Sequence, residues 1–436
     1  MCWILVGCRE PAGYREDARS AAAAGEAYAL PRGERELPAI PDSPTPDDLL
    51  QYAFRANAAL EAGYHRWHEA LARVSLASAW EAPRLSFGYL TSSGEMRAWD
   101  RTTLEVSQGI PLAGRRAVRS RQAMARLSSA RHQFEGMKFR IQMRILSGAA
   151  RYAYLGEAID LAREDLRLAE ESVTLVATRL STGMGTQAEL SGARLREEEA
   201  RNELRMIEAR AEAARADLNA LLGRDASLPL PFPSEEPLDE ILAGDAEIFR
   251  LAAERNHELL DMAAQARSQR DALAYARRAW VPDLMAGVEV MGDIEARVTG
   301  LLTLPLRAGA IRAAVREASA ALDAAEADRL ATYDDMRART VSALVMVRDA
   351  DRQARLFRGV LVPEVGRIAD LRAASYAAAG AMSDYRDVIE ARRALLALRL
   401  GEARAMAARA SAMAELEEVV ATDRSLWAGP APEEDE

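Results

Sequence analysis

The sequence of 436 residues contains little cysteine, few aromatic residues and no long apolar run. Its two cysteines, Cys2 and Cys8, both lie in the first eight residues, so the body of the chain has no thiol for a disulfide or a cysteine metal site. Without a run of eighteen or more apolar residues, no transmembrane helix is predicted. The net charge of −10 argues against nucleic-acid binding, because affinity for the phosphate backbone depends on clustered lysine and arginine.

Sequence signatures of catalysis are also missing. Glycine-rich phosphate loops and Ser/His/Asp patterns are absent. His65 and His68 would share a helix face, but no third ligand lies nearby in the sequence; the other two histidines are His132 and His257. The 15 methionines are scattered, as expected for side chains that fill gaps in helix packing. We therefore expect a protein that is not an enzyme and has no cofactor and no metal site.

Alanine, glutamate and arginine are abundant instead. The hydrophobic fraction of 49% includes much alanine, a composition that favours long helices packed side by side over a thick globular core. Periodicity and its glycine and proline interruptions predict a mainly α chain with helical stretches at 47–79, 115–181, 186–222, 246–279, 310–379 and 384–422. Residues 9–46 are expected to be an extended strap, 228–245 a proline-rich linker and 423–436 an acidic tail. A kink is expected at Pro363.

The order of these segments occurs twice, at 47–227 and at 246–422. Asn57 and Asn256 are 199 residues apart, and so are Pro83 and Pro282. This spacing indicates a tandem duplication with a period too long for a solenoid. The stretch 115–181 would be about 100 Å long as a helix, and the two shorter helices of the same repeat would together match it. We expect long antiparallel helical hairpins of uniform height.

Each repeat also contains one predicted β-hairpin between prolines, at 84–111 and at 283–305. Apolar and polar residues alternate along the strands, as in Leu104, Glu105, Val106 and Ser107. Strands of nine or ten residues are long enough to cross a bilayer when tilted. The alternation therefore predicts a membrane β-sheet with an apolar outer face; the alternative is a soluble hairpin that caps a coiled coil.

Three aromatic residues near the strand ends, Trp80, Tyr89 and Trp280, are candidates for an aromatic belt at the lipid headgroups. Because open sheet edges are not tolerated in lipid, four strands per chain must close with further copies of the chain. Two chains would form an eight-stranded barrel with a filled interior, whereas three would form twelve strands and leave a lumen.

The N-terminal segment Leu5-Val6-Gly7-Cys8 resembles the lipobox of a bacterial lipoprotein, in which the cysteine is acylated. Cys8 is then the expected lipid attachment site. Residues 1–8 would be a truncated signal, because the positively charged start of a secretory signal is missing. The alternative is a chance match of four residues.

Taken in order, several motifs resemble the TolC-type outer-membrane efflux factors, in particular the lipoprotein branch similar to CzcC and CusC. They are Asn57-Ala-Ala-Leu60, Val106-Ser-Gln-Gly-Ile-Pro-Leu-Ala-Gly114, Asp217-Leu-Asn-Ala-Leu-Leu-Gly223 and Gly183-Met-Gly-Thr-Gln-Ala-Glu-Leu190. The resemblance covers about residues 45–422. It implies a homotrimer in the bacterial outer membrane, with a twelve-stranded β-barrel on a periplasmic α-barrel. It also implies passive efflux of substrates such as metal cations or drugs, through a periplasmic adaptor and an inner-membrane RND-type pump or ABC exporter.

The resemblance also suggests roles for residues at the helix turns. In the family these turns follow Gly-x-x-Thr/Ser-x-x-acidic and contact the adaptor, which implies contact at Gly183, Thr186 and Glu189 and, in the second repeat, at Gly380 and Ser383. Arg386 occupies the acidic position of the second turn. A shift of one residue instead places Asp387 and Glu390 on the carboxylates that line the closed pore, so Arg386, Asp387 and Glu390 are candidate gate residues. The simpler interpretation is solvated helix charges.

A second function remains open from the sequence. The chain could be a soluble periplasmic coiled-coil scaffold or adaptor, in which the two hairpins would be exposed to water rather than to lipid.

Overall fold

The computed structural model describes residues 11–89, 91, 102–234, 240–291, 295–379, 385–422 and 426–429. The chain divides into two compact units, each assembled from separated segments. Unit 1 contains residues 1–26, 62–135 and 257–334, and unit 2 contains residues 27–61, 136–256 and 335–436. None of the described helices combines the length and the hydropathy that a membrane-crossing helix requires.

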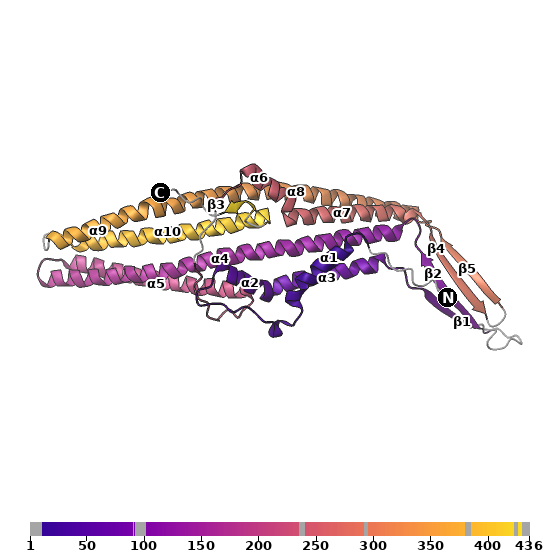
Figure 1. The fold of residues 1–436 in the computed structure, drawn as a ribbon, viewed down its shortest axis with the longest axis horizontal. Coiled ribbons are helices and arrows are strands. Elements are labelled where there is room, and N and C mark those ends of the chain that lie inside the picture. The colour runs from indigo at the N-terminus through magenta and orange to yellow at the C-terminus, as the bar shows by residue number, and fades with distance from the viewer. Residues whose placement is uncertain are drawn as a thin grey trace. The chain divides into compact units, whose positions relative to one another are not determined.

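The predicted class, mainly α with four longer β-strands, is confirmed (Figure 1). The helices are α1 (Tyr14–Gly25), α2 (Pro46–Ala56), α3 (Ala58–Ser78), α4 (Arg115–Ser181), α5 (Gln187–Leu222), α6 (Asp245–Arg255), α7 (His257–Arg277), α8 (Ala308–Leu356), α9 (Val362–Ala379) and α10 (Tyr385–Val420). The strands are β1 (Arg84–Tyr89), β2 (Thr102–Ile110), β3 (Glu240–Ile241), β4 (Asp283–Met291), β5 (Glu295–Thr303) and β6 (Ala428–Gly429). The long helix predicted over 115–181 has these bounds in the structure.

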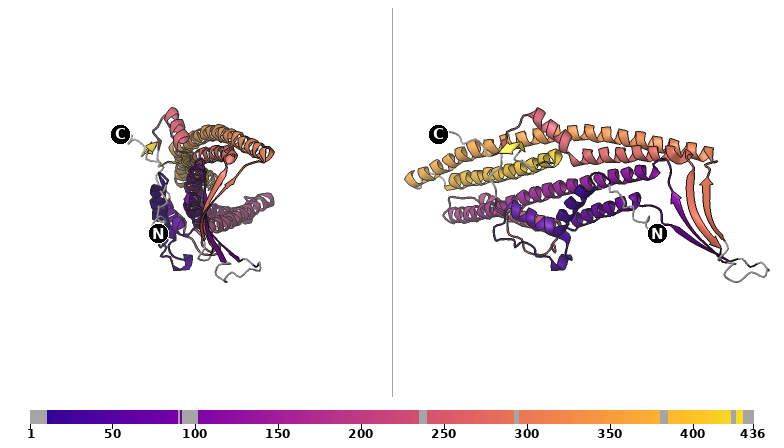
Figure 2. Two further views of the ribbon diagram at one scale, coloured as in Figure 1. Left: turned by 90° about the vertical axis from the view of Figure 1, so that its right-hand side faces the viewer. Right: turned by 45° about the vertical axis from the view of Figure 1, so that its right-hand side comes forward.

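Four strands of unit 1 form one sheet in the order β1-β2-β4-β5 (Figure 2). All three strand pairs are antiparallel, and the central pair joins β2 of the first hairpin to β4 of the second. The two predicted hairpins are therefore confirmed, and the duplication brings them together as one continuous sheet.

The predicted extended strap is wrong for residues 14–25, which form helix α1. Its alanine run favours helix, and buried Ala21 gives the helix a packing face. Gly25 ends it against Tyr64, where a Cβ atom would lie 2.2 Å from the phenol oxygen. Asp17 accepts a 2.9 Å hydrogen bond from Arg131 of α4. These contacts, which are remote in sequence, hold α1 in unit 1.

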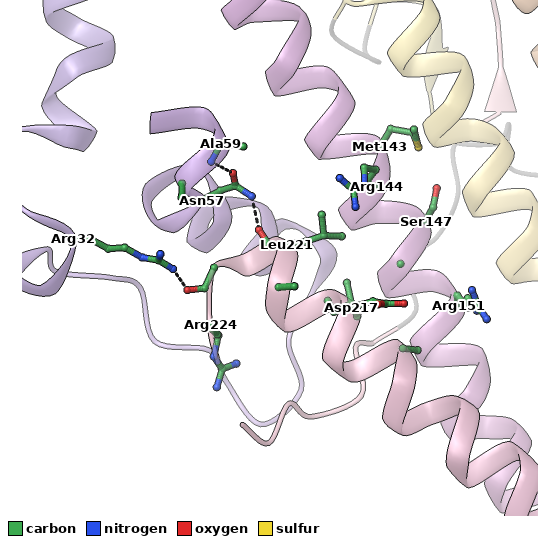
Figure 3. A pocket seen from close by; sticks show the side chains of 16 residues that line it. Arg32, Asn57, Ala59, Met143, Arg144, Ser147, Arg151, Asp217, Leu221 and Arg224 are labelled. Carbon is green, nitrogen blue, oxygen red and sulfur yellow. Dashed lines mark hydrogen bonds between the residues drawn. The ribbon is translucent and has the colours of Figure 1, made fainter. Parts of the chain in front are cut away.

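The stretches predicted as single helices at 47–79 and 246–279 are each interrupted by a buried asparagine. Asn57 separates α2 from α3, and Asn256 separates α6 from α7. The Asn57 side-chain amide donates to the Leu221 carbonyl at 2.7 Å (Figure 3), and the Asn256 amide donates to the Val419 carbonyl at 2.8 Å. In both repeats the amide thus donates to a carbonyl in the last turn of a helix, where carbonyl groups have no N–H partner within the helix.

The Asn57 cap lies at the edge of a cavity of about 790 Å³ in unit 2. Figure 3 shows the cavity wall formed by α4 and α5, together with the Arg32 side chain that donates to the Gly223 carbonyl. Gly223 has a φ of 70°, the left-handed conformation that commonly ends a helix. The helix end is thus tied both to Asn57 and to the N-terminal segment.

Unit 2 has a core that includes a residue from the C-terminal segment predicted as a tail. Trp427 is buried among Ile248, Leu344, Met413 and Leu416. Beside it, β6 pairs with β3, which lies inside the segment predicted as a linker. The buried aromatic side chain anchors this part of the C-terminal segment to the core of unit 2.

The predicted kink at Pro363 coincides with a local change of helix geometry. Residues Phe357–Leu361 form a π-helical turn between α8 and α9, just before the proline that cannot donate a backbone hydrogen bond. The Phe357 ring lies against Gly401 of α10, where a Cβ atom would be 2.4 Å from the ring. The glycine allows α10 to approach this irregular turn closely.

We predict that Asn256→Ala lowers the free energy of unfolding by about 1–3 kcal/mol, because a buried carbonyl loses its donor. Asn57→Ala should cost a similar amount. Urea unfolding followed by circular dichroism in detergent measures the change. Asn202→Ala, at an exposed position within α5, is the matched control and should have almost no effect. An equal loss in the control would contradict the assigned role of the two caps.

Candidate functional site

The four-stranded sheet of unit 1 has one face composed almost entirely of apolar residues. The register aligns Leu85 with Val106, Val106 with Val288, and Val288 with Val298 across all four strands. Their exposed fractions are 69%, 49%, 48% and 84%. A neighbouring row begins with Phe87, which is 71% exposed. Such a continuous apolar surface is not stable against water and must be covered by lipid or by protein.

The opposite face of the sheet is polar and charged. Glu105 is paired in register with Glu289, and Glu289 with Arg297. Arg297 lies 3.9 Å from the Glu289 carboxylate, and the Thr299 hydroxyl donates to Glu105 at 3.3 Å. The alternation predicted from the sequence therefore separates two faces of opposite character. A polar face of this kind suits a water-filled space.

The sheet ends in two strands with a free edge. Among the described residues, β1 and β5 each have only one partner strand. Their unpaired N–H and C=O groups are a template for further strand pairing.

The three predicted belt residues lie at the ends of the strands. Trp80 lies just before β1 and Trp280 just before β4, and each is 44% exposed. Tyr89, which is 50% exposed, is the last residue of β1. The two tryptophans thus lie at one end of the strands and the tyrosine at the other. The Arg116 guanidinium lies 4.6 Å from the centre of the Trp80 ring, a cation–π distance.

Arg115, the first residue of α4, contacts the segment that leads into β4 and so connects the sheet to the helices. Its guanidinium donates to the carbonyl of Arg278 at 2.8 and 3.1 Å and to that of Val281 at 2.7 Å, and it pairs with Asp283 at 2.5 Å. One side chain therefore holds the short connection between α7 and β4. No local pattern in the sequence indicates this role, because the partners lie more than 160 residues away.

The turn between α4 and α5 is built by the residues that the sequence singled out. Gly183 has a φ of 75°, and Met184 donates its backbone N–H to the Arg179 carbonyl at 2.8 Å, the closing bond of a Schellman motif. Thr186 and Glu189 then form a reciprocal capping box at the start of α5, with bonds of 3.2 and 2.9 Å. Gly183, Thr186 and Glu189 therefore share one compact turn.

The charge of Glu189 is favoured by its surroundings. The hydrogen bond from the Thr186 backbone N–H lowers the pKa of Glu189 below its ordinary value, and the positive charges of Arg179 and Arg386 lower it further. Arg386, one of the predicted gate residues, therefore lies near the turn between α4 and α5. The end of α9 and the start of α10 also lie at the same end of unit 2 as the turn between α4 and α5 in Figure 1.

The candidate gate residues lie on the first turns of α10 and take part in ion pairs. Asp387 accepts a 3.1 Å hydrogen bond from Arg372 of α9, and Arg386 lies 3.4 Å from Glu390 one turn along. Asp387 thus connects α10 to α9, whereas Glu390 pairs with a residue of its own helix. Gly380 and Ser383, like Cys8, lie outside the described residues.

Two contacts between α10 and α4 were not found from the sequence. Arg393 makes a bidentate pair with Asp165 at 2.6 and 2.9 Å, and Tyr385 lies within 3.5 Å of Glu171. The Arg393–Asp165 pair is only partly exposed, which makes it less screened than a surface pair. No local pattern indicates it, because the partners are 228 residues apart.

We predict that Glu189→Gln accelerates amide hydrogen exchange at the start of α5, because the charged cap is lost. Since the folded-state pKa of Glu189 is lowered, its contribution is present above the ordinary pKa of a glutamate and disappears as the pH falls through the folded-state pKa. Wild-type exchange, corrected for its intrinsic pH dependence, should therefore approach that of the variant in acid. Glu198→Gln on the same helix is the control. Equal acceleration by both variants would argue against the cap.

Comparisons with known proteins agree with the arrangement of helices and strands. A family model described as outer membrane efflux protein matches residues 49–224. The outer membrane protein VceC from Vibrio cholerae aligns with a TM-score of 0.71 and 16% identity, over 86% of this chain and 96% of its own. The MtrE outer membrane channel of Neisseria gonorrhoeae gives 0.72 and 16%, over 89% and 93%.

The structure of CusC is also similar, with a TM-score of 0.71 and 16% identity, over 89% of this chain and 98% of that chain. No curated protein sequence matches this chain. At such low identities the structural matches show the fold alone, and the family model matches residues 49–224 of the 436.

Proposed function

Because residues 49–224 belong to the outer membrane efflux protein family and the chain has the fold of such channels, we propose that this protein is the exit duct of a tripartite efflux system. The family is located in the outer membrane, as the sequence predicted. Substrates would pass through the duct passively from the periplasm to the outside. The energy would come from an inner-membrane partner.

The amphipathic sheet is the observation that carries this proposal. Its apolar face is 48–84% exposed along the row Leu85, Val106, Val288 and Val298, and its polar face bears Glu105 and Glu289. A lipid bilayer on one side and water on the other would satisfy both faces. The soluble scaffold would instead leave the apolar face in water.

Three copies of the chain would close the sheet. β1 and β5 run in opposite directions, so β5 of one chain can pair with β1 of the next in the antiparallel manner of the other pairs. Closure satisfies the backbone groups at both edges. Two copies would form eight strands, whose interior is filled by side chains, whereas three form twelve and leave a passage. A homotrimer therefore fits a duct.

The helix turns are the proposed docking site for a periplasmic adaptor. Gly183, Thr186 and Glu189 form a rigid, capped turn with exposed polar groups, and Gly380 and Ser383 are expected to serve in the second turn. The adaptor would connect the duct to an RND-type pump or an ABC exporter, and metal cations or drugs are the expected cargo. An acyl chain on Cys8 would add a lipid anchor.

The proposed gate depends on the charges at the start of α10. In a trimer, three copies each of Asp387 and Glu390 would form carboxylate rings that attract cations. The Arg372–Asp387 pair, at 3.1 Å, ties α10 to α9 and would help to keep the passage closed.

We predict that Leu85→Arg prevents insertion into the outer membrane, because a charge on the lipid face costs about 2–4 kcal/mol per chain near the bilayer midplane. Ser86→Arg, on the polar face of the same strand, is the matched control and should insert normally. Outer-membrane fractionation and the yield of detergent-extracted trimer measure both variants. Equal insertion of the two, or a wild-type chain recovered as a water-soluble monomer, would favour the soluble scaffold.

We predict that Arg372→Ala raises the open probability of single pores in planar bilayers, because Asp387 loses its partner on α9. Asp387→Asn should do the same and should also reduce the preference for cations. Arg367→Ala, which removes an exposed pair within α9, is the control. Unchanged gating in both Arg372→Ala and Asp387→Asn would show that this pair does not hold the gate.

A further inference from the structure

Two histidines from helices that are distant in sequence meet inside unit 1. His132 belongs to α4 and His257 is the first residue of α7. Their Nδ1 atoms are 3.4 Å apart, and their ring centroids are 5.6 Å apart with an angle of 30° between the planes. Both side chains are half-buried.

The distance between the two nitrogens is that of a long hydrogen bond and is also compatible with a shared metal ion. Hydrogen bonds from N–H groups commonly span about 2.7–3.2 Å, so 3.4 Å is long for one. Two metal–nitrogen bonds of about 2.0–2.1 Å at a tetrahedral angle place the nitrogens about 3.3–3.4 Å apart. The observed spacing of 3.4 Å is compatible with this value.

The surroundings of the pair hold both helices in place. Asp261, one turn after His257 on α7, accepts hydrogen bonds from Ser129 at 2.5 Å and from Gln133 at 3.1 Å, both on α4. Gln265 adds a bond to the same carboxylate at 3.1 Å. Since Asp261 is engaged in these bonds, it acts as a brace between α4 and α7 rather than as a ligand.

We propose that His132 and His257 bind one divalent transition-metal ion per chain and thereby link α4 to α7. Imidazole ligands favour Zn²⁺, Cu²⁺ or Ni²⁺. Among the described residues, no group of three or more histidine, cysteine, aspartate or glutamate side chains could hold a metal ion. Water therefore completes the coordination, and the ion exchanges with solvent. This site is separate from the gate and does not depend on which cargo is exported.

The other two histidines provide an internal control. His65 and His68 lie on one helix, α3, with both side chains exposed. The Tyr64 ring lies beside them, with centroid distances of 5.2 and 6.0 Å. Any general affinity of surface histidines for metal ions would affect this pair as well.

The test is Zn²⁺ titration calorimetry on the full chain in detergent. We expect His65→Gln/His68→Gln to retain the tightest site, at one ion per chain, and His132→Gln/His257→Gln to weaken it at least tenfold. Unchanged Zn²⁺ affinity in the His132→Gln/His257→Gln protein would overturn the proposal.

A second measurement uses the wild-type protein and does not depend on the folding of any variant. Carbethoxylation of histidines, mapped by mass spectrometry, should be suppressed by Zn²⁺ at His132 and His257 but not at His65 and His68. Equal modification with and without Zn²⁺ would mean that the two rings form a hydrogen-bonded pair only. Bilayer conductance is not part of either readout, so both tests remain valid if the proposed duct function fails.

Discussion

The pairing of β2 with β4 is the interaction on which the rest of this structure depends. It joins one strand from each repeat through a register that runs from Thr103 opposite Met291 to Ile110 opposite Leu284. Because this pair occupies the centre of the sheet, the outer strands β1 and β5 each have one free edge among the described residues, and the apolar row of Leu85, Val106, Val288 and Val298 on one face remains exposed. Backbone groups at a sheet edge cannot stay unpaired in lipid. Closure with further copies and contact with a bilayer follow from the same constraint.

The helical part of the chain is held together differently. Its alanine-rich helices bury little area per residue, so discrete polar contacts set the positions of helix ends and neighbours. Asn57 and Asn256 each satisfy a carbonyl at the end of a helix, and Arg393 pairs with Asp165 across two helices. Hydrogen bonds of this kind contribute only about 0.5–1.5 kcal/mol net, or somewhat more when charged, but they are specific in geometry. Such contacts determine register in helical packing that small side chains would otherwise leave poorly defined.

Most of the helices, both hairpins and the duplication could be predicted because their signals are local. Period-two alternation, proline boundaries and glycine turns act within a few residues of the chain. The predictions failed where distant contacts override local preference. Helix α1 forms in a segment expected to be extended, because Ala21 and Gly25 pack against other elements of unit 1. Similarly, Trp427 orders part of the segment that its acidic composition predicted to be a tail.

The candidate sites divide in the same way. The capped turn at Gly183, Thr186 and Glu189 was readable from the sequence, since all of its hydrogen bonds are made within a few residues. The partner of Asp387 and the contact between His132 and His257 could not be predicted from the sequence. The two histidines are 125 residues apart, and no spacing rule connects residues on different helices at that separation. Local sequence was enough to determine where helices, strands and turns form. Only the packing of α4 against α7 and of α9 against α10 decided which charged groups and which histidines face one another, because those contacts depend on how helices align in space.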